Sequence, residues 1–161
     1  MAINLNNATP AAPAGTVNAS WQQDGSGNVS ANIPASGTLL TLNSVDAVAQ
    51  AANIAATNLV ASAANAMYRV SITIIVSQTA TTSSTLPSVN ITWTDRNNGT
   101  LQTFTLTAAS PSVNTLTTYA QATLELSAQT ATAIQYATAS YASVGGTPMQ
   151  YALHIRIENM S

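Results

Sequence analysis

The sequence predicts an all-β protein, built as a sandwich or a barrel, and three observations lead to that prediction. Short stretches in which apolar and polar residues alternate recur along most of the chain. Glycine, proline, serine and asparagine separate these stretches, as expected of turns between strands. Hydrophobic residues make up 46% of the 161 residues but aromatic residues only 5%, so the core must consist mainly of Val, Ile, Leu and Ala.

The chain carries very little charge. Charged residues amount to 5% of the sequence, against about 25% in ordinary soluble domains. The chain has no lysine, and its cations are Arg69, Arg96 and Arg156. A net charge of −2 without a basic cluster argues against a nucleic-acid partner. Because so little charge protects poorly against self-association, we expect much of the surface to be buried in an assembly.

Several classes of site and segment are not expected in this chain. It has no cysteine, which excludes disulfides and thiolate metal sites. The first residues show neither the basic region nor the apolar run of a secretory signal. The longest apolar run, at residues 72–76, is far shorter than the roughly 20 residues that span a membrane. We therefore expect no cofactor, no bound metal and no membrane partner.

Residues 1–34 are expected to form a region of their own in front of a main domain at residues 35–161. Residues 1 to about 16 are rich in Asn, Ala and Pro, with Pro10 and Pro13 close together, which predicts an extended arm. Two interpretations stay open: the arm is a frayed terminus, or it docks on a neighbouring subunit.

A β-hairpin is expected after the arm. Val17, Ala19 and Trp21 alternate with polar residues, a second alternating stretch follows at residues 29–33, and the turn cluster DGSGN at residues 24–28 lies between them. A lone hairpin is only marginally stable in water. It must pack against the main domain or a partner, and Trp21 is the expected anchor.

The alanine-rich stretch at residues 42–66 permits two interpretations. Val45, Val48 and Leu59 fall near helical spacing, and alanine favours helices. Alternation also fits, because Ile54 and Val60 could share one face of a strand. The residues themselves leave open whether 45–64 contain a helix.

The remainder reads as a series of strands. Asn98-Gly99 supplies a turn suited to left-handed backbone angles between two of them. In the last strand Tyr151, Leu153, Ile155 and Ile157 alternate with polar residues. The expected strands lie at residues 67–78, 88–95, 101–108, 120–128, 133–142 and in the closing segment around 151–157.

His154, Arg156 and Glu158 are the candidates for chemistry, since they occupy one face of the last strand. A catalytic interpretation would make His154 a base oriented by Glu158, but these positions are about 13 Å apart on a strand. In the alternative interpretation this polar set faces solvent or a neighbouring subunit, which we favour. Arg156 and Glu158 could then pair with Arg69 or Glu125, across strands or subunits.

Other motifs are expected to be structural. Asp95 and Arg96 flank a turn, and no second acidic residue is spaced to complete a calcium site. Asp24 precedes two glycines but lacks the lysine of a phosphate-binding loop. Trp93 shares the register of Val89 and Ile91, which predicts core packing, and G-x-S-x-G does not occur.

Two stretches carry a resemblance to known proteins. NLVASAANAMYRVSITIIV and the final PMQYALHIRIENM resemble the trimeric jelly-roll domains of the complement and tumour-necrosis-factor type. The opening ATPAAPAGTVNASWQQDGSGNVSANIP looks like an N-terminal segment of phage virion proteins, among them head-decoration and tail-fibre proteins. The resemblance implies a jelly-roll β-sandwich, a homotrimer and a structural or binding role, and it favours strand and loop for the alanine-rich stretch.

The expected function is therefore that of a non-enzymatic capsid decoration (cement) protein on the virion surface, which binds the major capsid protein. The main alternative is a receptor-binding or tail-fibre tip domain that recognises a host-surface glycan or protein through loops 78–88 and 140–148. A surface-layer or fibre subunit and an enzyme are further alternatives. The expected interface residues are Pro10, Pro13, Trp21, Arg69, Glu125, His154, Arg156 and Glu158.

Overall fold

The computed structural model describes residues 20–23, 29–32, 40–61, 63–108 and 114–160. These residues form strands and no helix, which confirms the prediction of an all-β protein. Accordingly, no helix among them is long and apolar enough to cross a membrane. The chain divides into two compact units, Met1–Thr38 and Leu39–Ser161. The boundary predicted between residues 34 and 35 lies at residues that the structure does not describe.

The first unit contains the predicted hairpin. Strand β1 (Ser20–Gln23) pairs antiparallel with β2 (Val29–Asn32), and Trp21 lies opposite Ala31. This confirms the hairpin that the alternating pattern predicted. The predicted arm at residues 1–16, with Pro10 and Pro13, and the turn at residues 24–28 lie outside the described residues.

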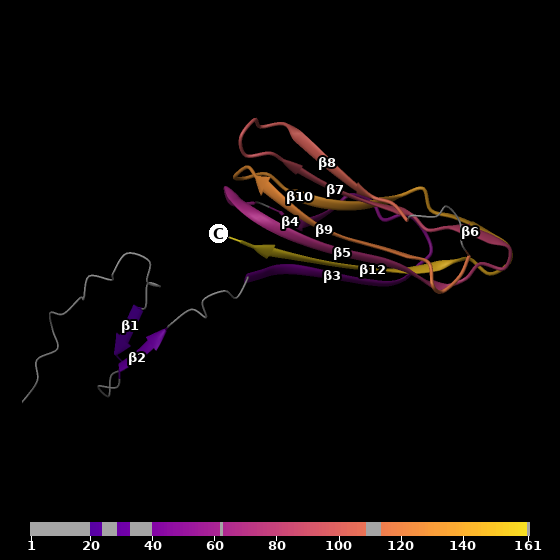
Figure 1. The fold of residues 1–161 in the computed structure, drawn as a ribbon, viewed down its shortest axis with the longest axis horizontal. Coiled ribbons are helices and arrows are strands. Elements are labelled where there is room, and N and C mark those ends of the chain that lie inside the picture. Colours follow the sequence, from indigo (N-terminus) through magenta and orange to yellow (C-terminus); the bar gives the residue numbers. More distant parts are fainter. Residues whose placement is uncertain (1–19, 24–28, 33–39, 62, 109–113, 161) are drawn as a thin grey trace, which may run out of the picture. The chain divides into compact units, whose positions relative to one another are not determined.

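The second unit is a β-sandwich of two antiparallel four-stranded sheets (Figure 1). The first sheet has the strand order β3 (Leu40–Gln50), β12 (Gln150–Asn159), β5 (Ala66–Gln78), β9 (Tyr119–Ala128). The second has the order β4 (Thr57–Val60), β10 (Ile134–Ala139), β7 (Ser88–Thr94), β8 (Leu101–Leu106). A small third sheet joins β6 (Ser83–Thr85) to β11 (Ala142–Val144). The jelly-roll path within this sandwich stays a prediction.

The alanine-rich stretch forms two strands and a loop. β3 pairs along its length with β12, and β4 pairs with β10. Val45 and Ala47 turn toward the core, against which they pack. Alanine's preference for helix is a weak one that tertiary pairing overrides. The described residues within 45–64 contain no helix, as the resemblance favoured.

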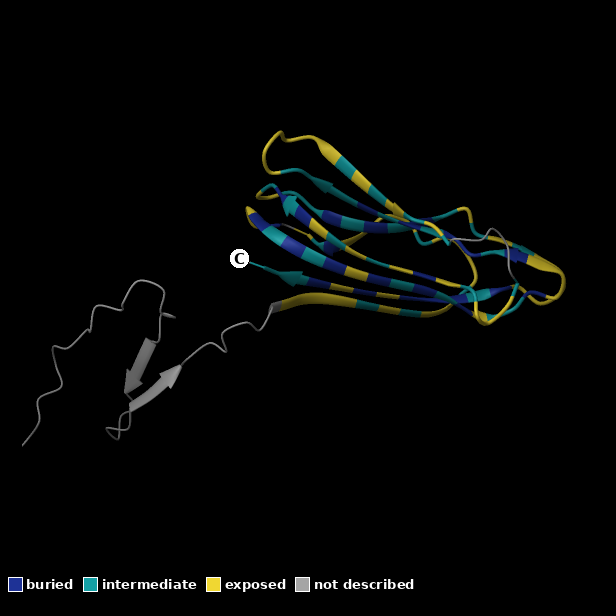
Figure 2. Cartoon of the chain, viewed as in Figure 1, coloured by how far each residue is buried: buried dark blue, intermediate teal, exposed yellow. Residues whose placement is uncertain are grey.

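The core lies between the two sheets and is filled by the inward residues of alternating strands. Tyr151, Leu153, Ile155 and Ile157 of β12 are all buried, as predicted. Figure 2 shows the resulting alternation of buried and more exposed residues along the strands. Because successive side chains of a strand point to opposite faces, burying one set leaves the other at the surface.

A buried polar network ties loop 51–56 to both sheets. The Tyr151 hydroxyl donates to the Ala52 carbonyl at 2.8 Å and lies 3.0 Å from Thr138 Oγ1. The Ile54 N–H donates to Thr138 Oγ1 at 2.6 Å, and the Thr138 N–H donates to the Ile54 carbonyl at 2.9 Å. Burial raises the pKa of the Tyr151 hydroxyl, while its hydrogen bond with Thr138 lowers it and burial dominates. Tyr151 therefore connects the loop between β3 and β4 to the core.

We predict that Tyr151→Phe lowers the free energy of unfolding by about 1–3 kcal/mol, because it leaves the Ala52 carbonyl and Thr138 without their buried partner. The raised pKa adds a pH dependence. The contribution of the Tyr151 hydroxyl to stability is complete below about pH 10, the pKa of a tyrosine in the unfolded chain. It is lost as the pH rises through the higher pKa of Tyr151 in the folded chain. Denaturant unfolding at pH 7 and at higher pH measures both effects. A variant as stable as the natural chain, or one with the same alkaline loss, would contradict this role.

Candidate binding face

The outer face of the first sheet gathers most of the ionisable side chains. The chain has three arginines, five acidic residues and one histidine. Six of these nine lie on the four strands of this sheet, at outward positions: Asp46, Arg69, Glu125, His154, Arg156 and Glu158. We call this set the charged face. It contains every predicted interface residue of the second unit, and the role of these residues in an interface stays a prediction.

Strand register brings these side chains into rows. Glu158 lies opposite Arg69, and Arg69 lies opposite Glu125 on the next strand. His154 lies opposite Asp46 on one side and Thr73 on the other. Neighbouring positions on one face of antiparallel strands are close enough for side chains to interact directly.

Two ion pairs form on the charged face. Arg69 Nη2 lies 3.1 Å from Glu125 Oε1, so these two residues pair with each other across strands, whereas the sequence suggested Glu158 and Arg156 as their partners. Arg156 Nη2 lies 2.9 Å from Glu158 Oε1, on the same strand. Arg156 also donates from Nε and Nη2 to Thr41 Oγ1, at 3.0 and 2.6 Å. Arg156 therefore pairs with its neighbour two residues along rather than with Glu125.

His154 has a partner that the sequence did not reveal. Its Nδ1 lies 2.7 Å from Asp46 Oδ1. Glu158, the orienting residue considered from the sequence, is bonded to Arg156 instead. Asp46 was missed because it belongs to the stretch whose structure was ambiguous. Only the pairing of β3 with β12 brings Asp46 beside His154.

The surroundings of His154 are open to solvent. Ser44, Ser71, Thr73 and Arg156 line a hollow with His154 and Asp46, but it is a shallow one. The side chains of His154 and Asp46 are 49% and 75% exposed, so water weakens their electrostatic effect. Backbone N–H groups of the central strands belong to the sheet ladders, so the donors that face this hollow are the side chains of Ser44, Ser71, Thr73 and Arg156. Among the described residues, no group of three or more metal-ligating side chains is placed to hold a metal ion.

The outer face of the second sheet is polar but uncharged. Gln135 Nε2 donates to Asn58 Oδ1 and Thr105 Oγ1 donates to Asn90 Oδ1, both at 2.8 Å. These cross-strand bonds connect β4 to β10 and β7 to β8. The outward residues of the sheet include Asn58, Ser88, Asn90, Thr92, Thr103, Thr105 and Gln135. We call this set the uncharged face.

The two loops considered as receptor-binding segments lie together. Loops 78–88 and 140–148 pair through β6 and β11, and we call this region the tip. Gly145 has a φ of 119°, and a Cβ there would lie 2.7 Å from Thr81 Cβ. Asn114 holds the tip further, because its side chain bonds both backbone groups of Ala80 and the Ser84 hydroxyl.

The β7–β8 turn and Trp93 have the structural roles expected of them. Asp95 Oδ1 accepts hydrogen bonds from the N–H groups of Asn97 and Asn98, at 2.9 and 3.3 Å. Gly99 takes the left-handed conformation at φ 66°. Trp93 packs against the core, as its register predicted.

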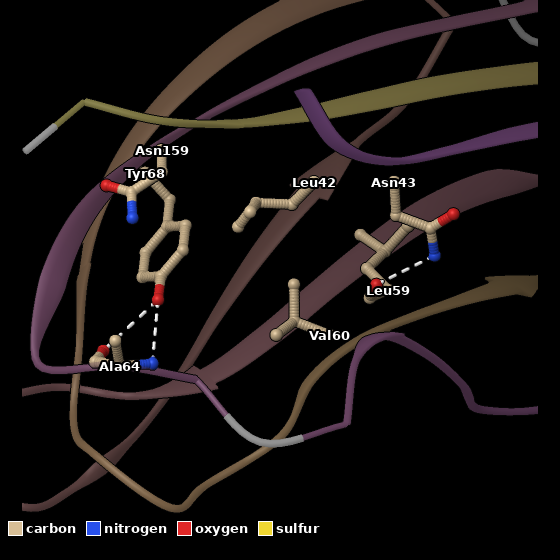
Figure 3. Close-up of a pocket in the computed structure, with 7 residues that line it drawn as sticks. All are labelled: Leu42, Asn43, Leu59, Val60, Ala64, Tyr68 and Asn159. Carbon is tan, nitrogen blue, oxygen red and sulfur yellow. Dashed lines mark hydrogen bonds between the residues drawn. The ribbon is translucent and has the colours of Figure 1, made fainter. Parts of the chain in front are cut away.

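A groove opens at the edge between β3 and β4 (Figure 3). Leu42, Leu59, Val60 and Tyr68 give it apolar walls. The Ala64 N–H donates to the Tyr68 hydroxyl at 2.8 Å, and this hydroxyl donates to the Ala64 carbonyl at 3.2 Å. The groove is therefore an apolar hollow in which the Tyr68 hydroxyl is held by the backbone of Ala64.

The Arg69–Glu125 pair provides a test of the charged face. The two side chains are 35% and 52% exposed, and exposed ion pairs contribute about 0.2–1 kcal/mol. A double-mutant cycle with Arg69→Ala and Glu125→Ala, measured by denaturant unfolding, should give a coupling in that range. Molar salt should reduce the coupling further. A coupling well above this range, or one unaffected by salt, would contradict the exposed geometry.

The comparisons with known proteins give no independent identification. Models of protein families, curated proteins and solved structures were compared with the chain, and none matches it. The two outer faces of the sandwich are therefore described by their geometry alone. The first sheet carries the charged face, and the second sheet carries the uncharged face.

Proposed function

We propose that this chain is a structural protein of a virus particle, namely a decoration protein that binds the outside of the capsid and stabilises it. The observation that carries the proposal is the distribution of charge over the second unit. The uncharged face offers hydroxyl, amide and small apolar groups together with the exposed side chain of Leu101, while the charged face holds charges that are already paired with one another. The resemblance to phage decoration proteins supports the same role.

Such a surface suits a protein that works in an assembled state. With so little net charge, copies repel one another weakly and associate readily. Contacts between uncharged polar groups are also less sensitive to salt than contacts between exposed ions. A decoration protein must hold its shell through changes of ionic strength, and this surface meets that requirement.

The mechanism we propose is mechanical. Three sandwich units associate into a homotrimer, and residues 1–34 of each copy, anchored by Trp21, bind the major capsid protein. Attachment at several points gives an avidity that a single contact lacks. The proposal includes no catalytic step, in keeping with the exposed and shallow setting of His154.

Deletion of residues 1–34 tests the proposal. The shortened protein keeps every strand of the sandwich unit, so it should retain its β-sheet circular dichroism and its oligomeric mass. It should no longer sediment with purified capsids, because its attachment segment is gone. Trp21→Ala in the full chain should weaken binding in the same assay, with Trp93→Phe as the matched control. Full occupancy of capsids by the shortened protein would overturn the role of this segment.

A receptor-binding or tail-fibre tip domain is the second candidate, and the tip favours it. β6 and β11 gather two loops at one end of the sandwich, where Val144 is exposed. Adjacent loops on a rigid scaffold are a common place for recognition.

In this second case we expect binding to a host-surface glycan or protein that Val144→Glu abolishes. Thr123→Glu is the control, because Thr123 is exposed on β9 of the first sheet and not on the tip. This substitution should leave binding unchanged. A glycan array and binding to intact host cells are the measurements. Binding that survives Val144→Glu would remove the tip from consideration.

A further inference from the structure

Strand β8 is an edge strand, and no strand of the described residues pairs with its outer side. It ends the strand order β4-β10-β7-β8. The Asp95 N–H donates to the Thr100 carbonyl at 2.8 Å, so Asp95 and Thr100 form a hydrogen-bonded pair. From this pair onward, every second residue of β8 bonds to β7. Gln102, Phe104 and Leu106 therefore direct their backbone groups toward β7. In an antiparallel pair the intervening residues direct theirs away, and on β8 these are Leu101, Thr103 and Thr105.

The other edges of the two four-stranded sheets carry features that discourage pairing, and β8 does not. β3 is bulged at two points and bears Asp46, and β9 bears Glu125 near its middle. β4 has only four residues and an irregular register. β8 has the sequence LQTFTL, pairs with β7 without a register shift, and holds neither charge nor proline. Charges, bulges and short strands are the usual means of protecting an edge.

We propose that β8 pairs antiparallel with β8 of a second copy, about a two-fold axis at Thr103. In this register Thr103 faces Thr103 of the second copy, and Leu101 faces Thr105. Each of these residues then exchanges both backbone hydrogen bonds with its counterpart. The second sheets of the two copies then form one continuous sheet. An isologous contact of this kind closes after two copies.

Packing and charge both support a second copy as the occupant. On the inner side of β8, Phe104 and Leu106 are only half-buried, unlike Val89 and Ile91 on the neighbouring strand. The proposed register places Gln102 of one copy beside Phe104 of the other, where the two chains would cover this apolar surface together. Because β8 carries no charge, two identical strands meet without like-charge repulsion.

This contact goes beyond the proposed decoration role and is independent of it. A two-fold contact cannot itself close a trimer. If the chain forms trimers through another surface, β8 pairing would link one trimer to the next. If it does not, β8 pairing alone gives a dimer.

Thr103→Lys tests the proposal in the full chain, since a lysine on the edge opposes pairing with an identical strand. Thr92→Lys is the matched control, because Thr92 lies directly opposite Thr103 on the same face but on the interior strand β7. Light scattering over a range of concentrations should give Thr103→Lys a lower mass than the natural chain, about half of it where β8 pairing joins single copies. Thr92→Lys should keep the natural mass.

Hydrogen exchange supplies the second readout. The N–H groups of Leu101 and Thr105 should exchange slowly in the natural chain and rapidly in Thr103→Lys. Those of Gln102 and Phe104, bonded to β7, should stay protected in both and so report that the variant is folded. Equal masses for the natural chain and Thr103→Lys, or rapid exchange at Leu101 and Thr105 in the natural chain, would overturn the proposal.

Discussion

The pairing of β12 with strands on both sides is the constraint on which the sandwich depends. β12 lies between β3 and β5, and β3 has no other strand to pair with in its sheet. Arg156 and Thr41, which touch across this pairing, are 115 residues apart in sequence. The first sheet is therefore complete only when both ends of the second unit have come together. Contacts so distant in sequence make folding slow, because a long loop must close before they stabilise the structure.

The same strand divides the molecule into a core and a surface. Inward residues of β12 fill the space between the sheets, while its outward residues supply half of the charged face. A slip of one residue in its register would exchange these sets and bury His154 and Arg156. Burying unpaired charge costs far more than an exposed ion pair contributes. The few charges of this chain thus help to specify register, even though each pair adds little to stability.

Most of the fold followed from the sequence because alternation is a local signal. The alternating pattern predicted the bounds of most strands to within a few residues, namely those of β5, β7, β8, β9 and β12. β3 and β4 stayed ambiguous because alanine favours a helix, whereas the alternation of apolar residues in the same stretch also fits a strand. Asp46 and the β6–β11 pairing were missed for another reason: both depend on contacts between distant segments. A pattern along one strand shows which residues share its face, but not which strand lies beside it.

The distribution of charge also links the two proposals. Charges placed along β3 and β9 protect both edges of the first sheet, whereas the second sheet carries none on its outer face and ends in the regular strand β8. A chain with so few charges cannot protect every edge, so their positions determine where association is permitted. Here they leave both the β8 edge and the uncharged face without charge. Both proposals depend on this arrangement, since each requires association through chosen surfaces and resistance to association elsewhere.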